Sequence, residues 1–155
     1  MTLQEIRELN NITYPEHEVG KDDMFQYVEE HKVNDKFTIV TGPAGCGKFT
    51  HYASKCDYSV NSQSIIDIAD LLREVRFVPG KDGENHPQIK NTEFAKYVLN
   101  GGTVLFDEIN YLSDTTLEFL IDLTSKTEDT DKFYFSRVHP DFKIIGVMTP
   151  SKYYT

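Results

Sequence analysis

The feature that most constrains the fold is a nine-residue run, Gly42 to Thr50 (GPAGCGKFT), that follows a β-branched stretch from Lys36 to Thr41. The β-branched stretch predicts a short strand, and the glycines predict a turn after it. We expect a helix to begin at Lys48. A strand, a glycine-rich turn and a helix in this order, with Gly47 directly before Lys48, form the pattern of a phosphate-binding loop.

The chemistry of such a loop follows from its backbone. Glycines let the chain turn so that successive N–H groups face an anion, and the following helix presents its positive N-terminal end to the same phosphates. Lys48 is expected to reach the β- and γ-phosphates of ATP. The alternative is a purely structural strand-to-helix turn. The residues predicted to bind nucleotide are Gly42, Pro43, Ala44, Gly45, Cys46, Gly47, Lys48, Phe49 and Thr50.

The residue after Lys48 departs from this pattern. The position normally holds a Ser or Thr whose hydroxyl binds Mg²⁺, and here it is Phe49, whose ring cannot bind a metal. Thr50 is one residue further along the helix, rotated by about 100°, so we expect it near the α-phosphate. Water can fill the vacant position, because Mg²⁺ often keeps several waters. We therefore expect slower turnover or weaker metal dependence.

A second motif lies at Thr103 to Glu108 (TVLFDE), where an apolar run predicts a buried strand that ends in two adjacent carboxylates. Asp107 is expected to hold magnesium through water. Glu108 is expected to orient and deprotonate the attacking water, the task of a general base beside the γ-phosphate. Such a strand end has little specificity alone, and gains it from the glycine loop.

The rest of the chain predicts alternating helices and strands. A first helix is expected from Thr2, because Thr2 and Glu5 fit a capping box, and a second around Met24 to Glu30. A third is expected along an apolar stripe of Ile65, Ile68, Ala69, Leu72 and Val75. A fourth spans Phe94 to Leu99 and ends at Asn100, Gly101 and Gly102, and a fifth lies around Leu117, Leu120 and Ile121. Strands are expected at Tyr58 to Asn61 and Lys143 to Met148, a hairpin or edge strand at Phe133 to Val138, and a loop from Phe77 to Pro87.

This alternation predicts an α/β fold with a parallel sheet, in which ligands bind beyond the carboxyl ends of the strands. The glycine loop, Asp107 and Thr149 all follow such ends. The length of 155 residues predicts a single domain, residues 1–155, with residues 1–35 as a helical segment packed on the core.

Composition restricts the function classes. The net charge of −9 disfavours nucleic-acid binding by a lone subunit, although it allows a local basic patch. Two cysteines, Cys46 and Cys56, without neighbouring ligand residues predict reduced thiols rather than a disulfide framework or a zinc site. The first residues lack the pattern of a secretion signal, and no apolar run approaches membrane-spanning length, so we expect a cytoplasmic protein without membrane contact.

Three stretches together resemble the MoxR and midasin (dynein-related) branch of the AAA+ ATPases. They are GPAGCGKFT, LNGGTVLFDEINYLSDTTLEFL and HPDFKIIGVMTPS, and the resemblance spans Phe37 to Ser151. It implies the three-layer sandwich of P-loop NTPases. It also implies that Thr149 occupies the sensor-1 position, usually Asn, which hydrogen-bonds the γ-phosphate or the attacking water. Asn61 matches a polar residue that can hold the catalytic glutamate away from water until a partner binds.

The resemblance also indicates which parts are missing. The sequence stops five residues after Pro150, where the family continues with a fifth strand, an arginine finger and a helical lid. We therefore expect a shortened AAA+ core. Three explanations stay open: an excised fragment, a naturally minimal protein, or a subunit of a homo-oligomer or complex in which another chain supplies the arginine. Arg137 is a weak candidate for contacting such a partner, and the favoured interpretation is that its charge is exposed to solvent.

Several functions remain open from the sequence. The first is an ATPase that assembles into an oligomer and remodels a protein client. The second is a slow or non-hydrolysing nucleotide-dependent interaction protein, which Phe49 and Thr149 favour. The third is a helicase or helicase loader, for which no basic tract is visible. A nucleotide kinase is disfavoured by the scarcity of arginine. The retained Glu108 favours the first, because a binding switch has no chemical need for it.

Overall fold

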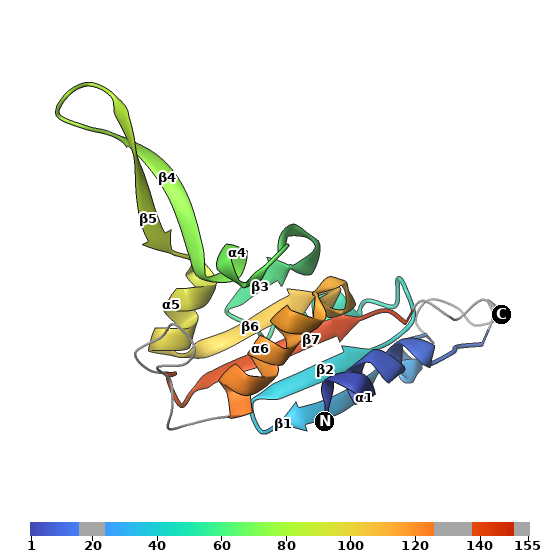
Figure 1. The fold of residues 1–155 in the computed structure, drawn as a ribbon. Helices are drawn as coiled ribbons and strands as arrows, with labels where there is room; N and C mark the ends of the chain where they lie inside the picture. The colour runs from blue at the N-terminus through green and yellow to red at the C-terminus, as the bar shows by residue number, and fades with distance from the viewer. Residues whose placement is uncertain (16–23, 126–137, 151–155) are drawn as a thin grey trace.

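The computed structural model describes residues 1–15, 24–125 and 138–150 as an α/β protein built on a mostly parallel five-stranded sheet (Figure 1). The sheet has the order β1-β2-β7-β6-β3. Its strands are β1 (Glu29–Asn34), β2 (Phe37–Thr41), β3 (Tyr58–Asn61), β6 (Gly102–Asp107) and β7 (Phe142–Met148). Strands β2, β7, β6 and β3 run parallel, and β1 pairs antiparallel with β2 at the edge.

Helices and one separate hairpin connect these strands. The α-helices are α1 (Leu3–Glu8), α3 (Lys48–Ala53), α4 (Ile68–Leu72), α5 (Glu93–Asn100) and α6 (Asp114–Ser125). Short 3₁₀ turns are η1 (Leu9–Asn11), η2 (Phe25–Tyr27), η3 (Ser62–Ser64) and η4 (Ile109–Tyr111). The hairpin consists of β4 (Arg73–Pro79) and β5 (Asn85–Asn91), and it projects away from the main sheet (Figure 1). No helix of the described ranges is long and apolar enough to cross a membrane.

The sheet carries helices on both faces because neighbouring residues of each buried strand point to opposite sides. Phe37 and Ile39 of β2 pack in a large core with residues of α1, α4, α5 and α6, whereas Val40 packs with Tyr52 of α3 on the other face. Figure 1 shows α1 and α6 lying over the same face of the sheet. The arrangement is compatible with a three-layer α/β sandwich.

Most predicted elements are confirmed, with caps that explain their bounds. Thr2 and Glu5 form the expected capping box of α1, and the Thr92 hydroxyl accepts a hydrogen bond from the Ala95 N–H at the start of α5. Gly101 ends α5 in a backbone conformation with φ of +92°. The predicted strands at Tyr58 to Asn61, Thr103 to Phe106 and Lys143 to Met148 are β3, β6 and β7, within one residue at either end.

The predictions for residues 65–91 were partly wrong. The helical stripe was expected to reach Val75, but α4 ends at Leu72, and the predicted loop from Phe77 to Pro87 is largely hairpin. Cross-strand pairs of Val75 with Ile89 and of Phe77 with Pro87 stabilise two strands, while the Gly-rich signal marks only the turn, where Gly83 has a φ of +78°. Local turn residues therefore marked the centre of the hairpin and not its extent.

The N-terminal segment also differs from its prediction. Residues 1–35 were expected to be helical, but the described part contains α1, two 3₁₀ turns and the edge strand β1, and of the helix predicted at Met24 to Glu30 only Met24 is α-helical. The segment packs on the core through the buried Ile6 and Leu9. The hairpin or edge strand predicted at Phe133 to Val138, apart from Val138 itself, lies outside the described residues, as does Arg137.

One arginine joins α1 to the turn that follows the acidic strand. The Arg7 guanidinium donates to the Asn110 carbonyl at 3.0 Å, to the Leu112 carbonyl at 2.6 Å and to the Asp114 carboxylate at 2.9 Å. These bonds join α1 to a carbonyl of η4, to the carbonyl of the residue after it and to the first residue of α6. Arg7 therefore fixes the chain directly after Asp107 and Glu108.

We predict that Arg7→Ala lowers the free energy of unfolding by about 2 kcal/mol, because charged hydrogen bonds to partly buried carbonyls are lost together. Urea denaturation followed by circular dichroism measures the change. Arg76→Ala, which removes the same charge from an exposed hairpin pair with Glu74, is the matched control, with an expected change within about 0.5 kcal/mol. Equal losses for both variants would contradict a specific role of Arg7.

Candidate functional site

The glycine loop lies between β2 and α3 and begins the candidate site. Gly45 and Gly47 have φ values of +72° and +88°, in the left-handed region that favours glycine. The left-handed Gly47 is the N-cap of α3, whose first residue is Lys48. A Cβ atom at Gly45 or Gly47 would meet no atom within 4 Å. These two glycines are therefore required for the backbone turn and not for close packing.

The parallel strands bring the predicted site residues together at their carboxyl ends. Thr41 at the end of β2 pairs with Met148 of β7, and Phe106 of β6 pairs with Gly146 of β7. Residues that follow these strands therefore meet. A pocket of about 470 Å³ is lined by Ala44, Gly45, Cys46, Gly47, Lys48, Phe49, Thr50, Asp107, Glu108, Val147 and Thr149.

The Lys48 side chain is almost fully buried and crosses between the loop and β7. Its ammonium donates to the Thr149 hydroxyl at 2.6 Å and to the Pro43 carbonyl at 3.1 Å. Burial lowers the pKa of Lys48, and the opposing effects of nearby Cys46, Asp107 and Glu108 are smaller. The site thus places a desolvated cation beside the residue predicted for the sensor position.

The two carboxylates sit in different backbone conformations. Asp107 ends β6, whereas Glu108 has φ and ψ of 51°, and Glu108 is the only described non-glycine residue with positive φ. Such a conformation costs roughly 1–2 kcal/mol for an ordinary side chain. Strain of this kind is often found at functional sites. It turns the Glu108 side chain to a direction that continuation of the strand would not give.

The partner of Glu108 is a residue that the sequence analysis missed. The Gln63 side-chain amide donates to the Glu108 carboxylate at 2.6 Å, and the Gln63 backbone N–H donates to the Asn61 side chain at 3.1 Å. Asn61, which was predicted to hold Glu108, caps η3 and lines a different pocket from Glu108. Gln63 lies two residues after Asn61 in the same turn, so the end of β3 is the sequence signal that could have found it.

Asp107 experiences both burial and a neighbouring negative charge. Burial is the main cause that raises its pKa, the Glu108 carboxylate raises it further, and Lys48 acts in the opposite direction with a smaller effect. A group whose folded-state pKa is raised destabilises the folded state once it ionises. In the free protein this penalty is absent below the unfolded pKa of Asp and complete above the folded pKa.

We therefore predict that Asp107→Asn stabilises the free protein at pH 7, and that the gain diminishes as the pH falls through the raised folded-state pKa of Asp107 and is lost below about 4, where Asp is protonated in both states. Urea denaturation of both proteins in buffer without divalent ions, at pH 7, 5 and 3.5, measures the difference. Asp35→Asn, a change at an exposed turn, controls for the general loss of one carboxylate. A constant gain at every pH would contradict ionisation of Asp107 as its cause.

The site fits the phosphates of a nucleotide better than it fits a complete metal shell. Its volume lies within the range of small-molecule pockets, and it combines loop N–H groups with Lys48. For Mg²⁺ it offers Asp107 and Glu108, while Phe49 lines the pocket where a hydroxyl ligand is expected. Among the described residues no group of three or more His, Cys, Asp or Glu could hold a metal. A metal would therefore depend on water and phosphate oxygens for most ligands.

No protein-family model matches this chain, and a search of curated proteins found no significant relative. The functional interpretation therefore depends on the residues of the site.

Proposed function

We propose that this chain is an ATP-binding module of the AAA+ type that hydrolyses ATP as part of an oligomer and uses the cycle to remodel a protein client. The observation that carries the proposal is the single pocket in which the glycine loop, Lys48, both carboxylates and Thr149 meet. Strand β7 lies between β2 and β6, so Thr149 follows the strand between the loop and the acidic pair. From this position the Thr149 side chain can contact groups bound by the glycine loop and by the acidic pair.

The residues divide the chemistry among them. Loop N–H groups and Lys48 bind the phosphates, and Lys48 leaves its contacts with Thr149 and Pro43 to reach the β- and γ-phosphates. Asp107 would hold magnesium through water, and the metal would supply positive charge that offsets the charge developing on these phosphates. Glu108 accepts the proton of the attacking water, and Thr149 orients the γ-phosphate.

Two features of the site favour slow hydrolysis by the isolated chain. Phe49 supplies no metal ligand. No arginine lines the described pocket, and Arg7, Arg73 and Arg76 are bound elsewhere, to η4, to Asn91 and to Glu74. Arginine commonly stabilises the charge of the phosphoryl-transfer transition state. A neighbouring subunit or partner chain that supplies an arginine would complete the site.

The proposal predicts a rate of phosphate release per subunit that rises with protein concentration, because assembly supplies the missing arginine. Lys48→Ala and Glu108→Gln should each lower this rate by at least about 100-fold, since each removes a reacting or charge-stabilising group. Phosphate release from Mg-ATP over a wide range of protein concentrations provides the measurement. Lys55→Ala and Glu118→Gln, which make the same changes at exposed positions, should keep the wild-type rate.

A second function competes with hydrolysis, namely a nucleotide-dependent interaction protein that binds ATP without turnover. Phe49 at the metal-ligand position is the observation that favours it. In the same experiment, ATP binding by wild type that Lys48→Ala abolishes, together with phosphate release no greater than that of Glu108→Gln at all concentrations, would establish this alternative. A rate that DNA stimulates would instead support a helicase or loader.

The bond between Gln63 and Glu108 gives a separate prediction. We infer that Gln63 restrains Glu108 in the free protein, because a 2.6 Å bond to the carboxylate occupies the oxygen that must accept a proton. Gln63→Leu should therefore raise the rate of phosphate release about tenfold at low protein concentration, with KM little changed. Steady-state phosphate release over a range of ATP concentrations measures the rate and KM, and Gln88→Leu on the exposed hairpin is the control. A rate reduced to that of Glu108→Gln would mean that Gln63 positions the base instead.

A further inference from the structure

The two edge strands of the main sheet, β1 and β3, differ in the side chains that they carry. Strand β1 protects its edge with a run of charged or titratable side chains, Glu29, Glu30, His31 and Lys32. Strand β3, which pairs only with β6 in the described sheet, carries Tyr58, Ser59, Val60 and Asn61 and no charge. Exposed edge strands present unpaired N–H and C=O groups, and charged residues are a common means of preventing unwanted pairing. The β3 edge lacks this protection.

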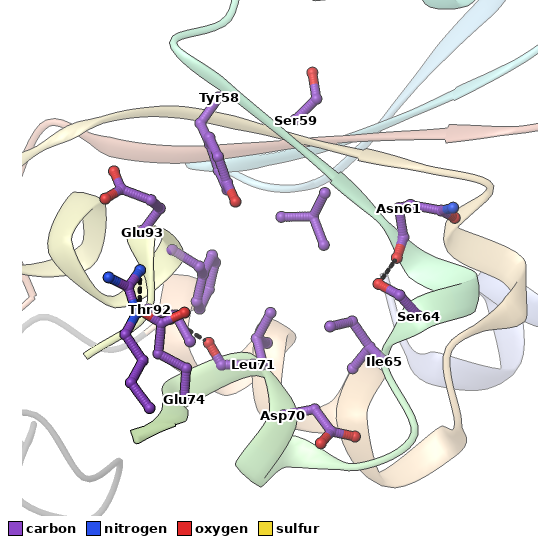
Figure 2. A pocket seen from close by; sticks show the side chains of 13 residues that line it. Tyr58, Ser59, Asn61, Ser64, Ile65, Asp70, Leu71, Glu74, Thr92 and Glu93 are labelled. Carbon is purple, nitrogen blue, oxygen red and sulfur yellow. Dashed lines mark hydrogen bonds and ion pairs between the residues drawn. The ribbon is translucent and has the colours of Figure 1, made fainter. Parts of the chain in front are cut away.

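A pocket of about 240 Å³ runs along this edge. All four residues of β3 line it, together with Ser64, Ile65, Asp70, Leu71, Glu74, Arg76, Thr92, Glu93 and Phe94 from η3 to α5. We call it the edge groove. Figure 2 shows the side chains of Tyr58, Glu93, Glu74 and Asp70 around an open centre. Val60, Leu71 and Phe94 form its base, and each is less than 10% exposed.

The polar rim of the edge groove has an excess of negative charge. Asp70, Glu74 and Glu93 contribute three carboxylates, against the guanidinium of Arg76 and the ammonium of Lys96 beside the groove. The Asp70 carboxylate also accepts hydrogen bonds from the backbone N–H groups of Ile66 and Asp67. Glu74 pairs with Arg76 at 3.0 Å, and Glu93 pairs with Lys96 at 2.8 Å. These pairs are exposed, so they exchange at little cost. The Tyr58 ring adds an aromatic face at which a cation can bind.

We propose that the edge groove binds an extended basic segment of a partner protein, which adds as a short strand beside β3. Backbone hydrogen bonds to β3 provide the affinity, an apolar side chain fills the base, and neighbouring Lys or Arg side chains contact the acidic rim. A partner of this charge also suits the whole chain, whose net charge of −9 opposes binding of a second copy. The proposal does not depend on nucleotide binding.

The test uses synthetic hexapeptides and the intact ¹⁵N-labelled protein. We expect the alternating peptide Lys-Val-Lys-Val-Lys-Val to shift backbone amide signals of β3, Thr92 and Glu93 in NMR spectra, and to bind at least about tenfold more tightly than its Glu-Val counterpart. N-methylation of alternate peptide bonds, which removes donors and keeps charge, should abolish the shifts. Equal binding of both charge types, undiminished binding after N-methylation, or shifts elsewhere would each overturn strand addition at this edge.

Charge reversal on the protein gives the second arm. Glu74→Lys should weaken binding of the basic peptide about tenfold at low ionic strength, whereas Glu84→Lys at the hairpin turn should leave it unchanged. Amide dispersion in the same spectra verifies that both variants are folded. Equal affinities of the two variants would exclude the rim as the contact. Size-exclusion chromatography with light scattering completes the test, because concentration-dependent dimers that Glu74→Lys abolishes would show that a second copy occupies the groove instead.

Discussion

The parallel pairing of β7 between β2 and β6 is the constraint on which the candidate site depends. Parallel strands end at the same edge, so the glycine loop after Thr41, the acidic pair after Phe106 and Thr149 after Met148 converge without any of them being near in sequence. The interior of β7 supports this arrangement through Gly146, where a Cβ atom would approach the Ile109 side chain to 2.5 Å. The turn after Glu108 can therefore pack directly on the central strand.

Strand β3 belongs to two regions of the molecule. Its side chains line the edge groove, and its last residue, Asn61, begins the turn that carries Gln63 to Glu108. On the other side of the acidic pair, Arg7 binds the carbonyls of Asn110 and Leu112. The Gln63 amide thus holds the Glu108 side chain, and the Arg7 guanidinium holds the backbone that follows it. The Arg7 contacts therefore stabilise the backbone that follows the left-handed Glu108.

The sequence predicted the three central strands well, because each joins a buried apolar run to a distinctive end: glycines after β2, carboxylates after β6 and Thr149 after β7. It did not predict the edge strand β1, which lies in a segment expected to be helical. It failed where pairing decides the structure. Val75 and Phe77 fit either a helical face or a loop until their partners Ile89 and Pro87 are known. Likewise, the choice between Asn61 and Gln63 as partner of Glu108 depends on the shape of a three-residue turn, which composition does not specify.

The position of β7 in the sheet has a consequence for folding. It is the last strand of the described chain, yet it occupies the centre of the sheet, about 100 residues after its partner β2. Until β7 has been synthesised, the β1–β2 pair and the β3–β6 pair can form only two separate half-sheets, in which the apolar strands β2 and β6 each lack one neighbour. Contacts between residues so distant in sequence form slowly and leave intermediates prone to aggregation. Growth at lower temperature or binding by a chaperone before β7 emerges should therefore affect the yield of this protein more than its final stability.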